Sequence, residues 1–341
     1  MDKYLVDVPV KINIWIRPEC QKQQFEIIKK AKPSILFIAS DGGRNEKEWE
    51  AIRSNRKMID EGIDWECEIY RMYEEKNLGM YTMGRKIHEW IWSKVDRCIF
   101  LEDDILPSVS FFRYCAELLE KYKDDLRVNV ICGMNHLGVS ENVTSDYFFS
   151  RQGSIWGCAM WRRTYEQYYD FAYGKDPYAM SLLKERTKHN RTFWKRIQTY
   201  ATQELYEGHV AGDEYYYEFS MYGYNQLQII PKKNMISNIG CTKDSAHADD
   251  LRLMPSGIRS VFNMKTYELD FPLKHAKYVI PDVGYEKKRN KIMAYNYPWR
   301  SRRYWIEKIW LKIRYGYWKE AVMTVINRAR RVVKVEKMSR T

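Results

Sequence analysis

The chain has 341 residues, of which 45% are hydrophobic and 15% aromatic, a composition that excludes an intrinsically disordered protein. Its seven cysteines are scattered without a CxxC pair, which argues against a disulfide framework and predicts free, buried thiols in a reducing compartment. The net charge of +12 is concentrated at one end, because residues 286–341 contain 17 Lys and Arg against four Glu while the preceding residues are close to neutral.

Strand-like and helix-like segments alternate along the first hundred residues. Strands are predicted at Lys11–Ile16, Ile35–Ala39, Glu66–Met72 and Cys98–Leu101, and helices at Pro18–Lys30, Glu46–Glu61 and Gly84–Lys94. Strands that alternate with helices form βαβ units with right-handed crossovers. The expected fold class is therefore α/β and Rossmann-like, with a mostly parallel central sheet and helices on both faces.

The predicted elements become shorter after residue 127. Strands are expected at Val128–Cys132, Ile155–Met160 and Leu227–Ile230, with helical segments over Arg163–Phe171 and Asp176–Tyr206. A β-ribbon is also expected over Val261–Asp270. These elements extend one domain, which we place at residues 1–285, and the basic residues 286–341 form a separate helical tail.

The tail contains a basic amphipathic helix, predicted over Arg302–Arg314. At 100° per residue one face carries Trp305, Ile306, Ile309, Trp310 and Ile313, and the flanks carry Arg303, Lys308, Lys312 and Arg314. The charge continues at Arg328, Arg330, Arg331, Lys334 and Lys337. A tryptophan-rich face between basic flanks favours an anionic membrane surface. The alternative is a helix packed on the domain, whereas nucleic acid is disfavoured because no recognised nucleic-acid-binding pattern accompanies the charge.

Polar residues follow three of the predicted N-terminal strands at the point where each strand ends. Arg17 follows the first, Asp41 the second, and the triplet Glu102-Asp103-Asp104 closes the fourth. Ligands of parallel sheets bind at the carboxyl ends of strands, so we expect a site there. Adjacent carboxylates repel one another unless a cation is present, and their hard oxygens suit Mg²⁺ or Mn²⁺. The alternative is an acidic helix N-terminus that begins near Ile105.

With these residues in order, the chain resembles the GT-A glycosyltransferases, in particular the branch with N-acetylglucosaminyltransferase I and the bacterial hemolytic-protein-A-like transferases. The resemblance covers about residues 8–282 and combines eight motifs, each weak by itself. They are Arg17-Pro18-Glu19, Ser40-Asp41-Gly42, Asn77-Leu78-Gly79 with Arg85, Glu102-Asp103-Asp104 with Pro107, Ile155-Trp156-Gly157, Gly212-Asp213-Glu214, Pro231–Asn234 leading to Asn238-Ile239-Gly240, and Asp244–His247.

The resemblance implies a donor site for a nucleoside-diphosphate sugar. It assigns Asp41 to the uracil ring, Arg17 to the nucleotide, Asn77, Gly79 and Arg85 to the nucleotide and diphosphate pocket, Asp103 to the ribose, Glu102 to the nucleotide or sugar, and Trp156 and Gly157 to the sugar pocket. Gly157 would allow a close approach of the backbone. Asp104 would ligate Mn²⁺ or Mg²⁺ carried by the diphosphate, and the cation would act as Lewis acid for the leaving group.

Two further residues are assigned by the resemblance. His247 would contact the metal or the diphosphate, although a lone histidine is also common as a surface or packing residue. Asp213 matches the catalytic base that takes the acceptor hydroxyl proton in an inverting transfer, with Glu214 as the alternative. A turn or helix cap before Tyr215–Tyr217 is the structural interpretation of Asp213. Gly212 stands where the family usually has tryptophan.

The expected function is that of a metal-dependent, inverting hexosyl- or N-acetylhexosaminyltransferase. It would use a UDP-linked donor and a glycan or lipid-linked acceptor in the synthesis of surface polysaccharide or glycoconjugates. The N-terminal residues lack an apolar leader and no run of 18 apolar residues occurs, so a cytoplasmic protein at the inner face of a membrane is expected. The alternatives are a sugar nucleotidyltransferase, although residues 11–19 lack its glycine-rich phosphate loop, and an inactive GT-A scaffold that binds carbohydrate or membrane.

Overall fold

The computed structural model describes residues 3–168, 175–188, 190–202, 219, 221–241 and 250–327. The chain divides into two compact units. The first comprises Met1–Gly240 and Asn263–Arg289, and the second comprises Cys241–Phe262 and Asn290–Thr341. The second unit thus combines the C-terminal helices with an earlier segment, Cys241–Phe262, that was expected to belong to the domain at residues 1–285.

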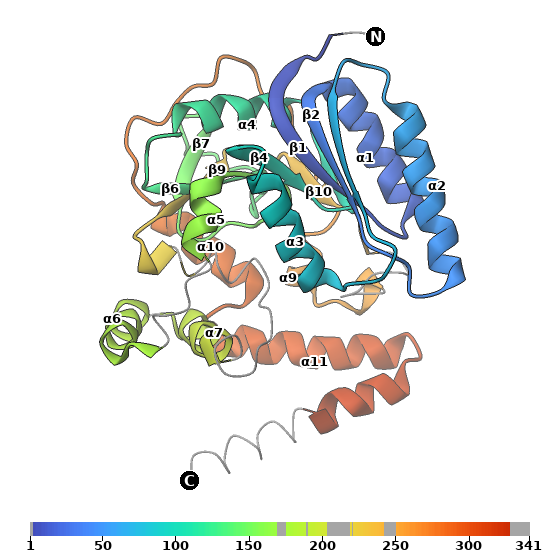
Figure 1. The fold of residues 1–341 in the computed structure, drawn as a ribbon. Coiled ribbons are helices and arrows are strands. Elements are labelled where there is room, and N and C mark those ends of the chain that lie inside the picture. Colours follow the sequence, from blue (N-terminus) through green and yellow to red (C-terminus); the bar gives the residue numbers. More distant parts are fainter. Residues whose placement is uncertain are drawn as a thin grey trace. The chain divides into compact units, whose positions relative to one another are not determined.

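The first unit is built on a sheet of eight strands in the described residues, in the order β3-β2-β1-β4-β8-β6-β9-β7 (Figure 1). The strands are β1 (Val6–Ile14), β2 (Pro33–Ser40), β3 (Glu68–Tyr73), β4 (Arg97–Leu101), β6 (Val128–Cys132), β7 (Tyr147–Ser150), β8 (Cys158–Trp161) and β9 (Leu227–Pro231). Strand β8 is antiparallel to β4 and β6, and β7 is antiparallel to β9. The remaining neighbours are parallel, as expected from the sequence.

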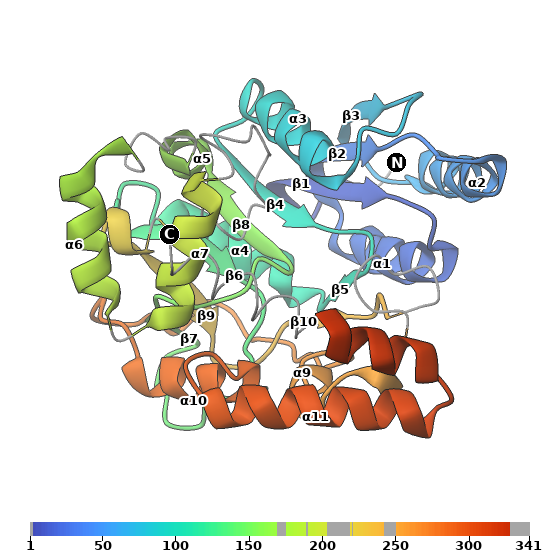
Figure 2. The same cartoon turned by 90° about the horizontal axis from the view of Figure 1, so that it is seen from below.

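The crossover helices lie on both faces of this sheet. They are α1 (Pro18–Ala31), α2 (Glu46–Gly62) and α3 (Met80–Trp92), followed by α4 (Ser110–Lys121). The connections through α1 and α2 step outward from β1 to β3, and α3 returns to β4 in the opposite direction. Because crossovers are right-handed, reversing the direction moves the helix to the other face. Figure 2 shows α1 and α3 on opposite sides of the sheet, which confirms the Rossmann-like α/β architecture.

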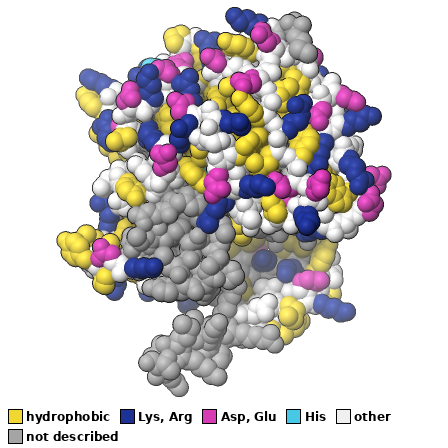
Figure 3. Space-filling model, in the orientation of Figure 1, with side chains coloured by type: hydrophobic (Ala, Val, Ile, Leu, Met, Phe, Trp, Pro, Cys, Tyr) yellow, Lys and Arg dark blue, Asp and Glu magenta, His cyan; other side chains and the backbone are white. Residues whose placement is uncertain are grey.

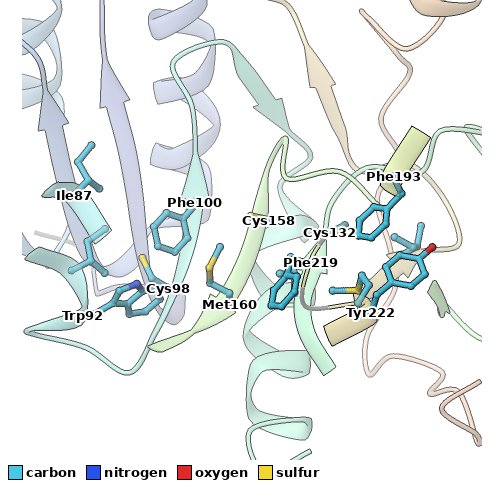
Figure 4. Packing of buried hydrophobic residues seen from close by; sticks show 14 of the residues in the cluster. Ile87, Trp92, Cys98, Phe100, Cys132, Cys158, Met160, Phe193, Phe219 and Tyr222 are labelled. Carbon is cyan, nitrogen blue, oxygen red and sulfur yellow. The ribbon is translucent and has the colours of Figure 1, made fainter. Parts of the chain in front are cut away.

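The core on the α3 side fixes the strands that lead to the carboxyl edge of the sheet. Ile87 and Trp92 of α3 pack with Cys98 and Phe100 of β4 and Met160 of β8 (Figure 4). These side chains are at most 7% exposed. All seven cysteines are free thiols, and five of them are buried. The end of β4 is therefore held by packing before any polar contact is considered.

One alternative interpretation and one expectation for local structure are wrong. Ile105–Pro107 does not begin a helix but forms strand β5, which pairs antiparallel with β10 (Ile236–Asn238), and α4 begins only at Ser110. The acidic triplet is therefore not a helix N-terminus. No strand forms in Val261–Asp270, where the chain makes isolated hydrogen bonds to Asn234 and Asn238 instead of a ladder.

Helices fill most of the second half of the described chain. They are α5 (Arg162–Tyr168), α6 (Pro177–Thr187), α7 (Arg191–Thr202), α9 (Ser256–Arg259), α10 (Val283–Met293) and α11 (Pro298–Arg314), with a 3₁₀ turn η3 at Leu251–Leu253. The helix expected over Asp176–Tyr206 is thus divided into α6 and α7. A further helix over 318–327 follows α11. Within the described residues, no helix is long and apolar enough to cross a bilayer.

The second unit shows which side of α11 is packed. Tyr304 and Leu311 are its buried residues, and the Tyr304 hydroxyl donates to the Ile292 carbonyl at 3.0 Å. The Ser256 N–H donates to the Glu307 carboxylate at 2.8 Å. The helix begins at Pro298, earlier than expected, because proline is well suited to a first helical turn.

Candidate functional site

The candidate residues meet at the carboxyl edge of the sheet. Arg17, Asp41 and Asn77 lie just beyond β1, β2 and β3, and the triplet 102–104 lies directly beyond β4. These four strands are parallel neighbours, so their carboxyl ends share one edge. These side chains therefore lie close together, as expected from the sequence, because their strands are neighbours in the sheet.

Trp156 and Gly157 reach the same edge from an antiparallel strand. In the register of β4 and β8, Phe100 faces Cys158, so the residues before Cys158 lie opposite those after Phe100. Gly157 has a φ of 60°, and its carbonyl accepts the N–H of Gly133 at 2.8 Å. A Cβ at this position would lie 2.9 Å from the Ile236 side chain, so this backbone approach requires glycine.

The centre of the site is a buried arginine between two carboxylates. Nη1 of Arg17 lies 3.1 Å from Oδ2 and 3.2 Å from Oδ1 of Asp103, and 3.0 Å from Oδ2 of Asp104. The three side chains are between 8% and 14% exposed. Charge-assisted bonds of this kind are strong, and leaving one partner buried alone is costly.

Burial and charge act in opposite directions on these groups. Burial lowers the pKa of Arg17, but the carboxylates of Asp103 and Asp104 outweigh it and leave that pKa raised. Burial raises the pKa of Asp103 to about 6, Arg17 opposes this rise and Asp104 adds to it. When both carboxylates are ionised they carry two negative charges against one guanidinium, which favours an additional cation.

Asp103 should make the stability of the metal-free protein depend on pH. Its pKa is about 6 in the folded chain against an ordinary value of 3.8, so the folded state retains a proton that the unfolded state releases. Stability should fall as pH rises from about 4 to about 6, by roughly 3 kcal/mol. Urea unfolding of wild type and Asp103→Asn between pH 4 and 7 measures this, and equal pH slopes would contradict it.

Residues late in the chain close the acidic end of β4. The N–H of Ile239 donates to the carbonyl of Asp104 at 2.9 Å, and the Ile239 carbonyl accepts from Cys20 Sγ at 3.7 Å. A Cβ on Gly240 would lie 1.9 Å from Oδ2 of Asp104, so only glycine fits there. The contact of Gly240 with Asp104 could not be predicted from the sequence, although Asn238-Ile239-Gly240 belongs to one of the motifs of the resemblance.

Asp41 organises the loop that precedes α3. Its Oδ1 accepts the N–H groups of Gly42 and Leu78, both at 2.9 Å. Its Oδ2 accepts the N–H of Gly79 at 3.0 Å and Nδ2 of Asn77 at 3.2 Å. A carboxylate has about four lone-pair positions, so these four donors occupy all of the positions at which Asp41 can accept a hydrogen bond. A nucleobase could bind Asp41 only by replacing one of them.

The same loop is fixed from two other directions. Arg56 donates through Nε to the Ser40 hydroxyl at 2.9 Å and through Nη2 to the Glu74 carbonyl at 3.1 Å. A Cβ on Gly42 would lie 2.5 Å from the backbone of Lys76. The ends of β2 and β3 are thereby joined into one rigid support for residues 77–79.

The other predicted residues have distinct positions. Glu102 is exposed, and its carbonyl accepts Nε2 of Gln24. Arg85 is half-buried in α3, and Trp156 is half-buried before β8. The candidate base Asp213, its neighbour Glu214 and the candidate metal ligand His247 lie outside the described residues.

The carboxylates present fit a divalent cation that arrives with its ligand. In the described part of the chain, no three His, Cys, Asp or Glu side chains converge as ligands. Mg²⁺ is usually held by one or two carboxylates together with substrate phosphates, not by an all-protein cage. Asp104, with Asp103 beside it, offers this donor set, and both carboxylates share the single guanidinium of Arg17.

Comparisons with known proteins give weak similarities. No protein-family model and no curated protein matches this chain. Among solved structures, mouse xyloside xylosyltransferase 1 in its apo form is 13% identical, over 64% of this chain and 82% of that chain, with a TM-score of 0.33. UDP-glucose pyrophosphorylase complexed with UDP-glucose is 15% identical, over 43% of this chain and 63% of that chain, with a TM-score of 0.27. Similarities of this size do not decide the reaction.

Proposed function

We propose that the chain is a metal-dependent, inverting GT-A glycosyltransferase with a nucleoside-diphosphate sugar as donor. The observation that carries this proposal is the pair of the buried Asp103 and the partly buried Asp104, bridged by Arg17 at the carboxyl edge of a Rossmann-like sheet. A nucleoside diphosphate with its cation supplies the positive charge and phosphate oxygens that such an edge lacks. The donor we propose is UDP-linked, with a hexosyl or N-acetylhexosaminyl group.

In this proposal each residue has a defined task. Asp104 holds Mn²⁺ or Mg²⁺, which when bound acts as Lewis acid on the leaving diphosphate. Arg17 orients the two carboxylates, and Asp103 faces the ribose. The loop 77–79 with Arg85 shapes the nucleotide and diphosphate pocket, and Glu102, Trp156 and Gly157 line the side toward the sugar.

The transfer itself needs a base on the acceptor side. The acceptor oxygen forms the new bond to the anomeric carbon while the bond from that carbon to the diphosphate breaks on the opposite face. The hydroxyl proton passes to a carboxylate, for which we propose Asp213, with Glu214 as the alternative. The acceptor would be a glycan or a lipid-linked sugar, and the enzyme would act peripherally at the cytoplasmic face of a membrane.

The proposal is tested by thermal unfolding with UDP, GDP, CMP and dTDP, each with and without Mn²⁺. One nucleotide should raise the melting temperature of the wild type in a metal-dependent way, because saturation at about a hundred times Kd adds about 2.7 kcal/mol. Asp104→Asn should lose this rise while remaining folded. Asp124→Asn, an exposed carboxylate before β6, is the matched control and should keep it.

Turnover then decides the reaction type. Release of the free nucleoside diphosphate from its sugar conjugate, dependent on Mn²⁺ and lost in Asp104→Asn, is the expected result. Formation of a nucleotide sugar from a nucleoside triphosphate and a sugar phosphate would show a nucleotidyltransferase instead. Metal-dependent binding without turnover in the presence of candidate acceptors would favour an inactive scaffold.

A further inference from the structure

The second unit exposes more large apolar side chains than it buries. Its described helices bury Tyr304, Leu311 and Ala321. On α11, Trp299, Ile306 and Trp310 are 78%, 59% and 51% exposed, and their spacing of seven and four residues places them on one side of the helix. We call these three residues the α11 stripe.

The helix over 318–327 has a similar stripe. Trp318, Val322 and Val325 are all exposed, and their spacing of four and three residues again marks one side of a helix. Lys312 connects this helix to α11, because its Nζ donates to the Thr324 hydroxyl at 3.0 Å. Polar groups outside the two stripes therefore join the two helices, because Nζ of Lys312 also donates to the Glu320 carbonyl at 3.4 Å.

Positive charge flanks the α11 stripe. The helix has six Lys and Arg and a single acidic residue, Glu307, which is bound to Ser256 within the same unit. The guanidinium of Arg302 lies 4.9 Å above the ring of Trp299, and that of Arg314 lies 5.0 Å from the ring of Trp310. Figure 3 shows hydrophobic and basic side chains side by side in this region, at the lower right.

We infer that these helices dock on an anionic phospholipid membrane, lying parallel to its surface. Exposed tryptophans beside basic residues suit the boundary between lipid headgroups and acyl chains, where the ring enters the apolar layer and the cation meets phosphate. The guanidinium groups of Arg302 and Arg314 lie next to the rings of Trp299 and Trp310, which would enter the apolar layer. The stripes would insert, and the basic flanks would select anionic lipid. This inference does not depend on the proposed catalytic function.

The test uses the full-length protein and sedimentation with vesicles. Partition onto phosphatidylcholine vesicles containing about one third phosphatidylglycerol should exceed partition onto phosphatidylcholine alone by at least about tenfold. Partition onto the anionic vesicles should fall when the salt concentration is raised from about 0.1 M to about 1 M, because this shortens the electrostatic screening length from about 10 Å to about 3 Å. Equal binding to both vesicle types, or none to either, would overturn the inference.

Variants distinguish insertion of the α11 tryptophans from nonspecific adsorption of exposed aromatic side chains to vesicles. The double variant Trp299→Ser/Trp310→Ser should partition at least about tenfold more weakly than wild type, with an unchanged melting temperature because both side chains are exposed. Tyr178→Ser removes an aromatic ring that is 71% exposed on α6 in the first unit, and it should bind as wild type does. Wild-type binding by the double variant, or tight binding of RNA or an acidic protein without vesicle binding, would contradict a membrane surface. Nucleotide binding in solution should be the same for all three proteins.

Discussion

Replacing Arg17 with methionine should lower the free energy of unfolding by about 3–5 kcal/mol at pH 8. Methionine fills much of the same volume, but Asp103 and Asp104 would remain buried without the guanidinium that both contact. At pH 5 the loss should be smaller, because one of the two carboxyl groups can take up a proton. Urea unfolding at the two pH values measures both numbers.

The matched control is Arg53→Met. Arg53 contacts Glu46 at 2.6 Å, but the two side chains are 59% and 78% exposed, so water screens the pair. Its removal should change stability by less than about 0.5 kcal/mol. If Arg17→Met were as mild as this control, the two bridged carboxylates would not repel each other strongly, and they would not favour an added cation.

Asp41→Asn should weaken the binding of every nucleotide by a similar factor, of about tenfold, which is about 1.4 kcal/mol. The amide would present an NH₂ group to backbone N–H donors that Asp41 now accepts, so the loop 77–79 would lose its support. Calorimetric titration of wild type and variant with UDP, CDP and dTDP in the presence of Mn²⁺ gives the loss of affinity for each of the three nucleotides. A stability loss of about 1–3 kcal/mol should accompany them.

This experiment separates two roles of Asp41. If the carboxylate binds the base, as the resemblance to GT-A glycosyltransferases implies, Asp41→Asn should weaken the binding of uracil and thymine, which donate at N3, and favour cytosine, which accepts there. If it acts through the loop, as its four bound donors indicate, the order of affinities should not change. Glu75→Gln, an exposed carboxylate in the same loop, should leave all three affinities unchanged.

The parallel part of the sheet could be predicted because its signals are local. β1 to β4 are short apolar runs that end in polar residues, and the intervening helices have their own periodicity. The position of Arg17, Asp41 and Asp104 at one edge then follows from topology alone. For this reason the candidate site could be located before its geometry was known.

What the sequence could not predict depends on contacts between distant segments. β5 and β10 have three residues each, too few for a periodic signal, and they form only because residues 105–107 meet residues 236–238. Three of the four donors on Asp41 are two backbone N–H groups and one side-chain amide of residues 77–79 in a separate loop, so residue type did not indicate them. On α11, the periodicity identified an apolar side, but Tyr304 and Leu311 on another side are the ones that pack.

The pairing of β5 with β10 also determines when the site can assemble during synthesis. Cys20 and the Ile239 carbonyl that closes over it are 219 positions apart, and Gly240 is the residue that fits against Asp104. A nascent chain can form the parallel strands as soon as β4 has emerged, but the acidic end of β4 stays open until β10 arrives. Closure of the acidic end of β4 is therefore expected among the last steps of folding, and a chain truncated before residue 236 would have the parallel strands without the segment that covers Asp104.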